Sequence, residues 1–176
     1  TASAAFQKTG MTSVTVLKDI SYGSNAFDSC ASLVSVTVEE GVTEIGNYMF
    51  QNTKLTDVTL PNSVTKIGAS AFNGCSLTTI NFGQGVKTIE NSAFQNCGEL
   101  TEIILPDATE TLGQNAFGDC PKLAKISLGK NMKTLEAYCF VGYSKGCPLL
   151  GDIICRATTP PTLKDDYGTG PFGGGL

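Results

Sequence analysis

The sequence predicts an α/β solenoid, a right-handed coil in which each turn contributes short parallel strands and a short helical or 3₁₀ turn. Two observations predict this class. A period of 22 to 23 residues runs through nearly the whole chain, and apolar residues fall at the same places in every period. Such self-similarity is the signature of repeat architectures, in which one unit cannot bury its apolar face alone and must stack on its neighbours.

The most regular mark of the period is a phenylalanine that follows a small or sulfur-containing residue. Its successive spacings are 21, 23, 22, 22, 23 and 23 residues, which gives about seven repeats. These aromatic residues are Phe6, Phe27, Phe50, Phe72, Phe94, Phe117 and Phe140. We expect each of them to lie on the helical or 3₁₀ turn of its repeat.

A Leu-x-x-Ile-x-Leu pattern follows each aromatic turn and predicts a strand. Leucine opens the pattern, an aliphatic residue comes three positions later, and a further apolar residue comes two positions after that. The middle aliphatic residues are Val36, Val58, Ile80, Ile103 and Ile126. Because side chains alternate along a strand, the middle aliphatic points into the core and its two neighbours point to solvent.

A second extended stretch is predicted by two aliphatic residues three positions apart, such as Val42 and Ile45. In three repeats a glycine follows this pair and is expected to ease a turn. These glycines are Gly46, Gly68 and Gly113. In one repeat either Ala108 or Thr109 must take the place of the valine, and we expect weaker packing there.

The string Leu-x-x-Ile-x-Leu-Pro-x-x-Val-x-x-Ile-Gly-x-x-Ala-Phe-x-x-Cys, almost complete from Leu55 to Cys75, resembles the repeat of the BspA-like leucine-rich repeat family of bacterial surface proteins. The resemblance covers residues 5 to about 165. It implies a horseshoe-like leucine-rich repeat solenoid, a secreted or cell-surface location, and adhesion to host matrix proteins or other cells. The segment from Cys155 to Leu163 is similar to the one that closes such arrays in this family.

The resemblance and the composition divide the chain into a solenoid over residues 1–165 and a flexible Gly-rich tail over residues 166–176. The tail is expected to be a truncated terminal unit, since Phe172 would begin the further aromatic turn that follows in the family. The chain also starts at Thr1 inside a repeat, which predicts a processed or truncated piece of a longer protein.

One repeat carries an insertion. Phe140 and Cys147 lie seven positions apart, whereas Phe117 and Cys120 lie three positions apart. Residues 141–146 are therefore expected to protrude as a loop.

The cysteines invite a redox or metal interpretation. Four of them share one repeat position: Cys30, Cys75, Cys97 and Cys120. Their Cβ atoms should be ~5 Å or more apart, whereas a disulfide needs about 3.8 Å, so we expect small buried thiols. Neither a Cys-x-x-Cys motif nor a histidine is available for a metal site. A disulfide among Cys139, Cys147 and Cys155 remains open, and the odd total of seven leaves at least one thiol free or paired between chains.

The chain contains no histidine, which excludes Ser-His-Asp and Cys-His catalysis and zinc hydrolysis of the His-Glu-x-x-His type. Adjacent acids such as Glu39 and Glu40 point apart on an extended chain and cannot act as an acid and base pair. The Gly-rich end lacks the Lys-Ser/Thr of a phosphate loop. We therefore predict no catalytic residue, no cofactor and no metal site.

The charge pattern limits the partners. The formal net charge is −4, and the twelve basic residues are scattered singly, which disfavours nucleic acid and anionic membranes. No apolar run approaches the roughly 20 residues of a transmembrane segment.

The remaining candidate is a binding face made of the residues that flank each middle aliphatic, which we call the strand face. Its first column is Ser13, Ser35, Asp57, Thr79, Glu102, Lys125 and Asp152. Its second column is Thr15, Thr37, Thr59, Asn81, Ile104, Ser127 and Ile154. Threonine and serine suit exposed strands without any function. However, solenoids present such faces as binding surfaces, and the aliphatic residues in the second column could anchor a partner.

We therefore expect a non-enzymatic, adhesin-like domain that binds a protein or cell-surface macromolecule through the strand face and the loop at 141–146. Two alternatives stay open. The domain could be a structural spacer that presents another domain, or a repeat enzyme that acts on glycans, although the acids of the first column are isolated from one another.

Overall fold

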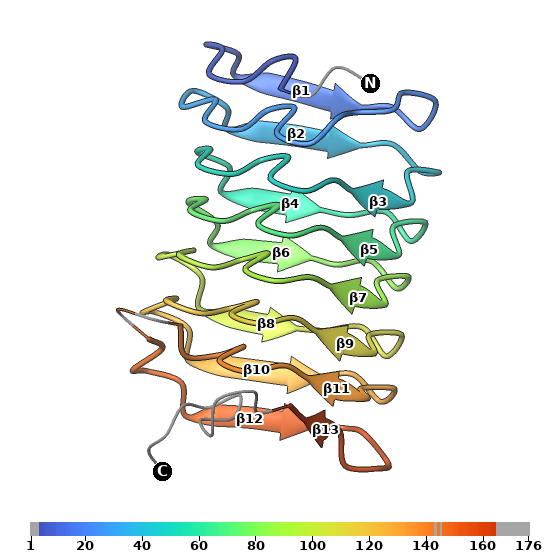
Figure 1. Cartoon of the computed structure of the whole chain (residues 1–176), viewed down its shortest axis with the longest axis vertical. Helices are drawn as coiled ribbons and strands as arrows, with labels where there is room; N and C mark the ends of the chain where they lie inside the picture. The colour runs from blue at the N-terminus through green and yellow to red at the C-terminus, as the bar shows by residue number, and fades with distance from the viewer. Residues whose placement is uncertain (1–3, 143, 145, 165–176) are drawn as a thin grey trace.

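The computed structural model describes residues 4–142, 144 and 146–164. They form an elongated solenoid of stacked, flattened turns, with the first and last repeats at opposite ends (Figure 1). The predicted solenoid class is confirmed. No helix of the described residues is long and apolar enough to span a bilayer.

Each repeat after the first runs along a first strand, turns, and returns along a second, shorter strand, whereas the first repeat has only the first strand. The first strands are β1 (Ser13–Val16), β2 (Ser35–Val38), β4 (Asp57–Thr59), β6 (Thr79–Asn81), β8 (Glu102–Ile104), β10 (Lys125–Leu128) and β12 (Asp152–Cys155). The second strands are β3 (Glu44–Ile45), β5 (Lys66–Ile67), β7 (Thr88–Ile89), β9 (Thr111–Leu112), β11 (Thr134–Leu135) and β13 (Thr162–Leu163). The second extended stretch predicted from the aliphatic pairs is therefore present.

The second strands form one six-stranded parallel sheet in the order β13-β11-β9-β7-β5-β3. Its register places Ile45 on Ile67 and Ile67 on Ile89, so the aliphatic residues stack in an inward column. All three are fully buried. The first strands are also parallel, but they divide into three sheets, β1-β2, β4-β6 and β8-β10-β12.

The two breaks among the first strands coincide with a change of spacing in the sequence. Before β6, Leu77 follows Cys75 by two residues, whereas before β8, Leu100 follows Cys97 by three. A change of one residue also accompanies the break between β2 and β4. The step from β1 to β2 absorbs the same change and keeps its pairing. A change of one residue in this spacing therefore accompanies a broken ladder at two steps, from β2 to β4 and from β6 to β8. At the step from β1 to β2 the ladder continues across the same change.

The aromatic turns differ from the expected helical or 3₁₀ geometry, since no helix occurs among the described residues. In the second turn, Phe27 lies between two left-handed residues, Asn25 with φ 63° and Ser29 with φ 58°. A left-handed residue cannot continue a right-handed helix. The chain instead makes two overlapping β-turns, closed by hydrogen bonds from Asp28 N to Asn25 O (3.1 Å) and from Cys30 N to Phe27 O (3.3 Å).

These tandem turns are bonded to the next repeat as regularly as the strands are. The amides of Asn25, Phe27 and Ser29 donate hydrogen bonds of 2.8 to 3.0 Å to carbonyl oxygens one repeat later. The acceptors are Asn47, Met49 and Gln51. The same three-bond pattern recurs from turn to turn through the array. The backbone polar groups of the turn are therefore satisfied between repeats rather than within a helix.

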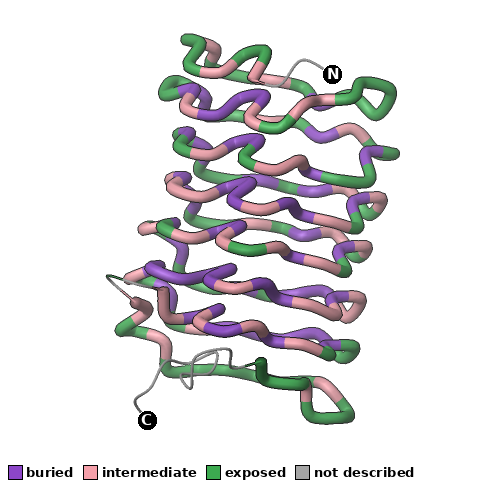
Figure 2. The backbone as a smooth tube through the Cα atoms, viewed as in Figure 1, coloured by how far each residue is buried: buried purple, intermediate pink, exposed green. Residues whose placement is uncertain are grey.

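The first strands form one wall of the coil, which we call the first wall, and the second strands form the other. The core is a column of aromatic rings between these two walls. Successive rings from Phe6 to Phe117 stack with centroids 5.2 to 5.6 Å apart and interplanar angles of 7 to 19°. Phe82, which follows β6, meets Phe94 edge to face at 5.6 Å and so joins the first wall to the aromatic turn. Burial is greatest in the middle repeats and falls at both ends (Figure 2). Phe6, in the first repeat, is 44% exposed.

The repeat with the uncertain valine position uses Thr109. This residue is fully buried, and its hydroxyl donates a hydrogen bond of 2.9 Å to the carbonyl oxygen of Val86.

The described part of the inserted loop is bonded to the preceding repeat, because the amides of Ser144 and Gly146 both donate to Asp119 Oδ1 at 2.9 Å. The predicted tail at 166–176 lies outside the described residues.

Candidate functional site

The strand face predicted from the sequence is formed by β1, β2, β4, β6, β8, β10 and β12. Register pairs place its members side by side, as in Asp57 with Thr79 and Thr59 with Asn81. Most of the two columns are exposed, while Lys125 is half-buried. Ser127 is a correction, since it is only 9% exposed and thus buried. The face is therefore not a uniform polar grid.

The first column is held together by contacts between neighbouring repeats. Thr79 Oγ1 donates to Asp57 Oδ1 at 2.7 Å, and Thr56 Oγ1 donates to Asp57 Oδ2 at 2.9 Å. These hydrogen bonds, that from Thr79 first, lower the pKa of Asp57. Further along, Lys125 Nζ lies 2.8 Å from Glu102 Oε1, and this contact raises the pKa of Lys125. Asp57 is thus held by neutral hydroxyls, whereas Glu102 and Lys125 form an ion pair.

The second column explains why Ser127 is buried. Its register partners are Ile104 in β8 and Ile154 in β12. Both isoleucines stand out from the sheet, with 59% and 45% of their surface exposed. Because serine is small, the larger side chains of the two flanking isoleucines cover it from solvent. The result is an exposed aliphatic pair on an otherwise polar face, and isolated groups of this kind can anchor a partner.

A cleft of about 380 Å³ opens at the break between β6 and β8. One side carries Asn81 and the turn after β6, and the other carries Ile104. Asp107 and Arg156 also line it. Its volume lies within the range of small-molecule or side-chain pockets. The place where the first strands lose their ladder is therefore also the place where the strand face is hollowed, with a mixed lining of apolar and polar residues.

Arg156 joins three successive repeats beside this cleft. Its Nε donates to the carbonyl oxygen of Leu128 at 3.2 Å and its Nη2 to that of Leu105 at 3.0 Å. Nη2 also lies 3.4 Å from Asp107 Oδ1. A hydrogen bond from Lys130, and more weakly the charge of Arg156, lower the pKa of Asp107. The planar guanidinium satisfies two strand-end carbonyls at once, which a lysine could not do.

Five of the seven cysteines are buried in the core, while Cys147 is half-buried and Cys155 is exposed. All seven are free thiols, so the open question of a disulfide among Cys139, Cys147 and Cys155 is answered by three unpaired sulfurs. Burial raises the pKa of Cys75 to about 11 and that of Cys120 to about 12. Such thiols carry almost no nucleophilic thiolate at neutral pH. Within the described residues, no group of three or more Cys, Asp or Glu side chains converges on a common metal position.

Sequence reasoning placed the columns of the strand face but missed the cleft and Arg156. The cleft had a signal, the change in spacing from Cys75–Leu77 to Cys97–Leu100. Arg156 had none, because its contact with Leu105 spans 51 residues.

The sequence model for the BspA type leucine-rich repeat region matches residues 2–75 and 20–146, with six copies. No curated protein matches the chain in sequence.

Three solved structures are similar in fold. A leucine-rich cell surface protein of Faecalibacterium prausnitzii has a TM-score of 0.69 at 22% identity, over 88% of this chain and 50% of its own. A leucine-rich repeat protein of Bacteroides ovatus has a TM-score of 0.68 at 29% identity, over 86% and 39%. One from Eubacterium ventriosum has a TM-score of 0.66 at 27% identity, over 86% and 45%.

This chain thus spans half or less of the length of each of these structures. The family match covers most of the chain, and the stacked turns, the two strands per repeat and the aromatic column agree with it. The chain belongs to the BspA-type leucine-rich repeat family.

Proposed function

We propose that this domain is a non-enzymatic binding module that holds a protein or another cell-surface macromolecule on its strand face. The observation that supports it is the exposed pair Ile104 and Ile154, of which Ile104 lines the cleft between β6 and β8. An apolar centre within a polar rim is the usual anatomy of a protein interface. The remaining outward threonines, serines and acids would form that rim.

The proposal includes location at the cell surface. The similar Faecalibacterium prausnitzii protein is described as a cell surface protein, and the family resemblance implies adhesion to matrix proteins or cells. The inserted loop at 141–146 would be a second contact. Of its described residues, Ser144 is exposed.

The test is a binding assay with solubilised extracellular matrix and with intact epithelial cells as probes. Ile104→Asp places a charge at the centre of the face and is expected to weaken binding about tenfold or more, as loss of an interface anchor does. Leu149→Asp is the matched control, because Leu149 is 61% exposed but lies outside the strand face. Both variants should keep the unfolding midpoint of the parent chain.

If charge reversals along the first column and introduced charges along the second leave binding unchanged, the strand face is not the interface, and the spacer alternative gains support. Turnover of an acidic glycan by the purified chain would contradict the non-enzymatic part of the proposal.

A further inference from the structure

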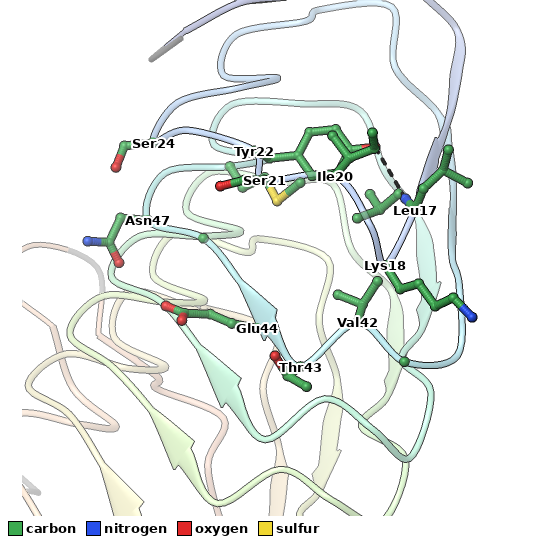
Figure 3. Close-up of a pocket in the computed structure, with 14 residues that line it drawn as sticks. Leu17, Lys18, Ile20, Ser21, Tyr22, Ser24, Val42, Thr43, Glu44 and Asn47 are labelled. Carbon is green, nitrogen blue, oxygen red and sulfur yellow. Dashed lines mark hydrogen bonds between the residues drawn. The ribbon is translucent and has the colours of Figure 1, made fainter. Parts of the chain in front are cut away.

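The first repeat has no second strand, and this leaves one edge of the six-stranded sheet open. The strand at that edge is β3. Phe6 and Phe27 are 21 residues apart, the shortest spacing in the chain, and Tyr22 stands where the following repeats have Ile45 and Ile67. The chain over residues 17–23 therefore passes above β3 as a loop (Figure 3).

Tyr22 holds this loop in place. Its ring lies 5.6 Å from that of Phe27 at an angle of 48°. Its hydroxyl accepts a hydrogen bond from Leu17 N at 3.2 Å and donates one to Thr15 O at 3.5 Å. The loop is thus fixed to the first strand and the aromatic column instead of to β3.

The amides of β3 that face this loop have no acceptor among the described residues. Elsewhere in the sheet each repeat donates two such bonds to the one before it. For β5 they run from Thr65 N to Thr43 O at 2.9 Å and from Gly68 N to Ile45 O at 2.8 Å. The corresponding donors one repeat earlier are the amides of Thr43 and Gly46. Thr43 is exposed and Gly46 half-buried, so both can reach an acceptor from outside.

A groove of about 380 Å³ lies between the loop and β3. Leu17 and Ile20, 44% and 50% exposed, supply its apolar side. Glu44 lines it from the strand, toward the opposite end from Lys18 (Figure 3).

Two glycines at the same repeat position show that the groove occupies the place where a preceding repeat would otherwise pack. A Cβ at Gly68 would lie 2.5 Å from Asn47 Oδ1 and 2.8 Å from Asn47 N, because the preceding repeat fills that space. A Cβ at Gly46 would meet nothing within 4 Å. The groove therefore reaches both free amides.

We propose that this groove binds an extended peptide segment of another protein, which adds to the sheet as a parallel strand beside β3. The carbonyl oxygens of the peptide accept from Thr43 N and Gly46 N, and its apolar side chains contact Leu17 and Ile20. Addition of a strand to an exposed edge is an established mode of peptide recognition, in which main-chain bonds give affinity and side-chain pockets give selectivity.

The negative charge of Glu44 at the open edge favours a basic residue at the position of the peptide that lies opposite it. On the side of β3 that is already paired, Lys66 Nζ of β5 lies 3.1 Å from Glu44 Oε1. The same Nζ lies 3.1 Å from Glu90 Oε1 of the next repeat. These two contacts raise the pKa of Lys66. Glu44 already has a basic partner in register on its filled side, so a lysine or arginine of the peptide in register with Glu44 would give it a second basic partner on the open side. The preferred partner is an extended segment with a basic residue followed by an aliphatic one.

The probe is the acetylated and amidated peptide Ser-Val-Thr-Lys-Ile-Gly-Ala, which copies residues 63–69 and so carries the side chains that already pair with the other edge of β3. It is titrated to about 1 mM, the range of weak affinities, into the ¹⁵N-labelled chain. Hydrogen exchange of the Thr43 and Gly46 amides should slow at saturation. The amides of Thr65 and Gly68, already bonded, serve as internal controls and should not change.

Two variants make the test specific. Gly46→Leu fills the groove and should abolish binding, whereas Gly98→Leu, also at a glycine where a Cβ meets nothing within 4 Å, should not affect it. Glu44→Lys should weaken binding about threefold, as exposed ion pairs do, and a peptide with glutamate in place of its lysine should recover that loss. Glu110→Lys, inside the filled sheet, is the charge control.

Unchanged exchange of Thr43 and Gly46 at the highest peptide concentration would overturn the proposal, as would equal binding by Gly46→Leu. Self-association of the chain that Gly46→Leu abolishes would also overturn it, because the occupant would then be a second copy. None of these outcomes depends on the strand face.

Discussion

The thiol of Cys97 donates a hydrogen bond of 3.3 Å to the carbonyl oxygen of Phe72, in the preceding repeat. The same bond joins Cys75 to Phe50 and Cys120 to Phe94. The cysteines of the column are therefore small donors, each to the phenylalanine carbonyl of the preceding turn. Thr53, at the same repeat position, instead donates at 2.9 Å to the carbonyl oxygen of Phe50 in its own turn.

Removal of one of these donors should destabilise the array. Cys97→Ala removes one of the two hydrogen bonds to the carbonyl oxygen of Phe72, which keeps that from Cys75 N at 3.2 Å, and it removes a fully buried sulfur. We expect the free energy of unfolding to fall by about 1–3 kcal/mol, measured by urea denaturation. Cys155→Ala, at the exposed cysteine, should leave the midpoint unchanged. An equal effect of both changes would rule out the role assigned to the column.

The buried thiols also predict alkaline instability. Burial raises the pKa of Cys75 and Cys147 to about 11 and that of Cys120 to about 12, from an ordinary value of 9.0. Above pH 9 the unfolded thiols lose protons that the folded ones keep. The free energy of unfolding should therefore be unaffected by these thiols below pH 9 and fall as the pH rises toward 11–12. Urea midpoints at pH 8 and pH 10.5 test this, and Cys75→Ala should reduce the difference between them.

Two glycines at the same repeat position should respond differently to alanine. Gly68→Ala places a Cβ against Asn47 and should cost about 1–3 kcal/mol, as overpacking does. Gly46→Ala enters open space and should change stability by less than about 0.5 kcal/mol. Thermal unfolding of the two variants side by side measures the difference. Similar losses in both would mean that the first repeat does cover Gly46.

Arg156 should determine how firmly β12, the last of the first strands, is held. Arg156→Ala removes the bonds to Leu105 and Leu128, so hydrogen exchange over β12 should rise about tenfold, the effect of losing ~1.4 kcal/mol from local opening. Arg156→Lys should not restore protection, because one ammonium cannot replace both guanidinium donors. Exchange over β3, at the other end, is the internal reference. Full protection with lysine would show that charge alone suffices.

The sequence predicted the solenoid, the strand positions and the buried column, because burial repeats with the period of the fold. The column was predicted to end at Cys120, but Cys147 continues it after the insertion, since its thiol donates to Phe117 O at 3.3 Å. It failed at the aromatic turns, where alanine and phenylalanine suggested a helix. The signal lay two residues to either side, where Asn25, Ser29 and their counterparts adopt left-handed conformations.

The candidate site was predicted only in part. The alternation of side chains along a strand predicts which residues face outward. The burial of Ser127, however, depends on the sizes of Ile104 and Ile154, which lie on the two strands that flank it. The open edge of β3 depends on where a loop of the first repeat passes. Its traces in the sequence were Tyr22 at an isoleucine position and the short spacing of 21 residues from Phe6 to Phe27.

The break between β6 and β8 gives the two walls different mechanical properties. The sheet of second strands is hydrogen-bonded from β3 to β13, so it resists extension along the axis of the array. The wall of first strands has two gaps, and its pieces can separate without rupture of a ladder. Bending of the array should therefore widen or narrow the cleft beside Ile104 while the other wall keeps its length, so curvature and the shape of the strand face are coupled.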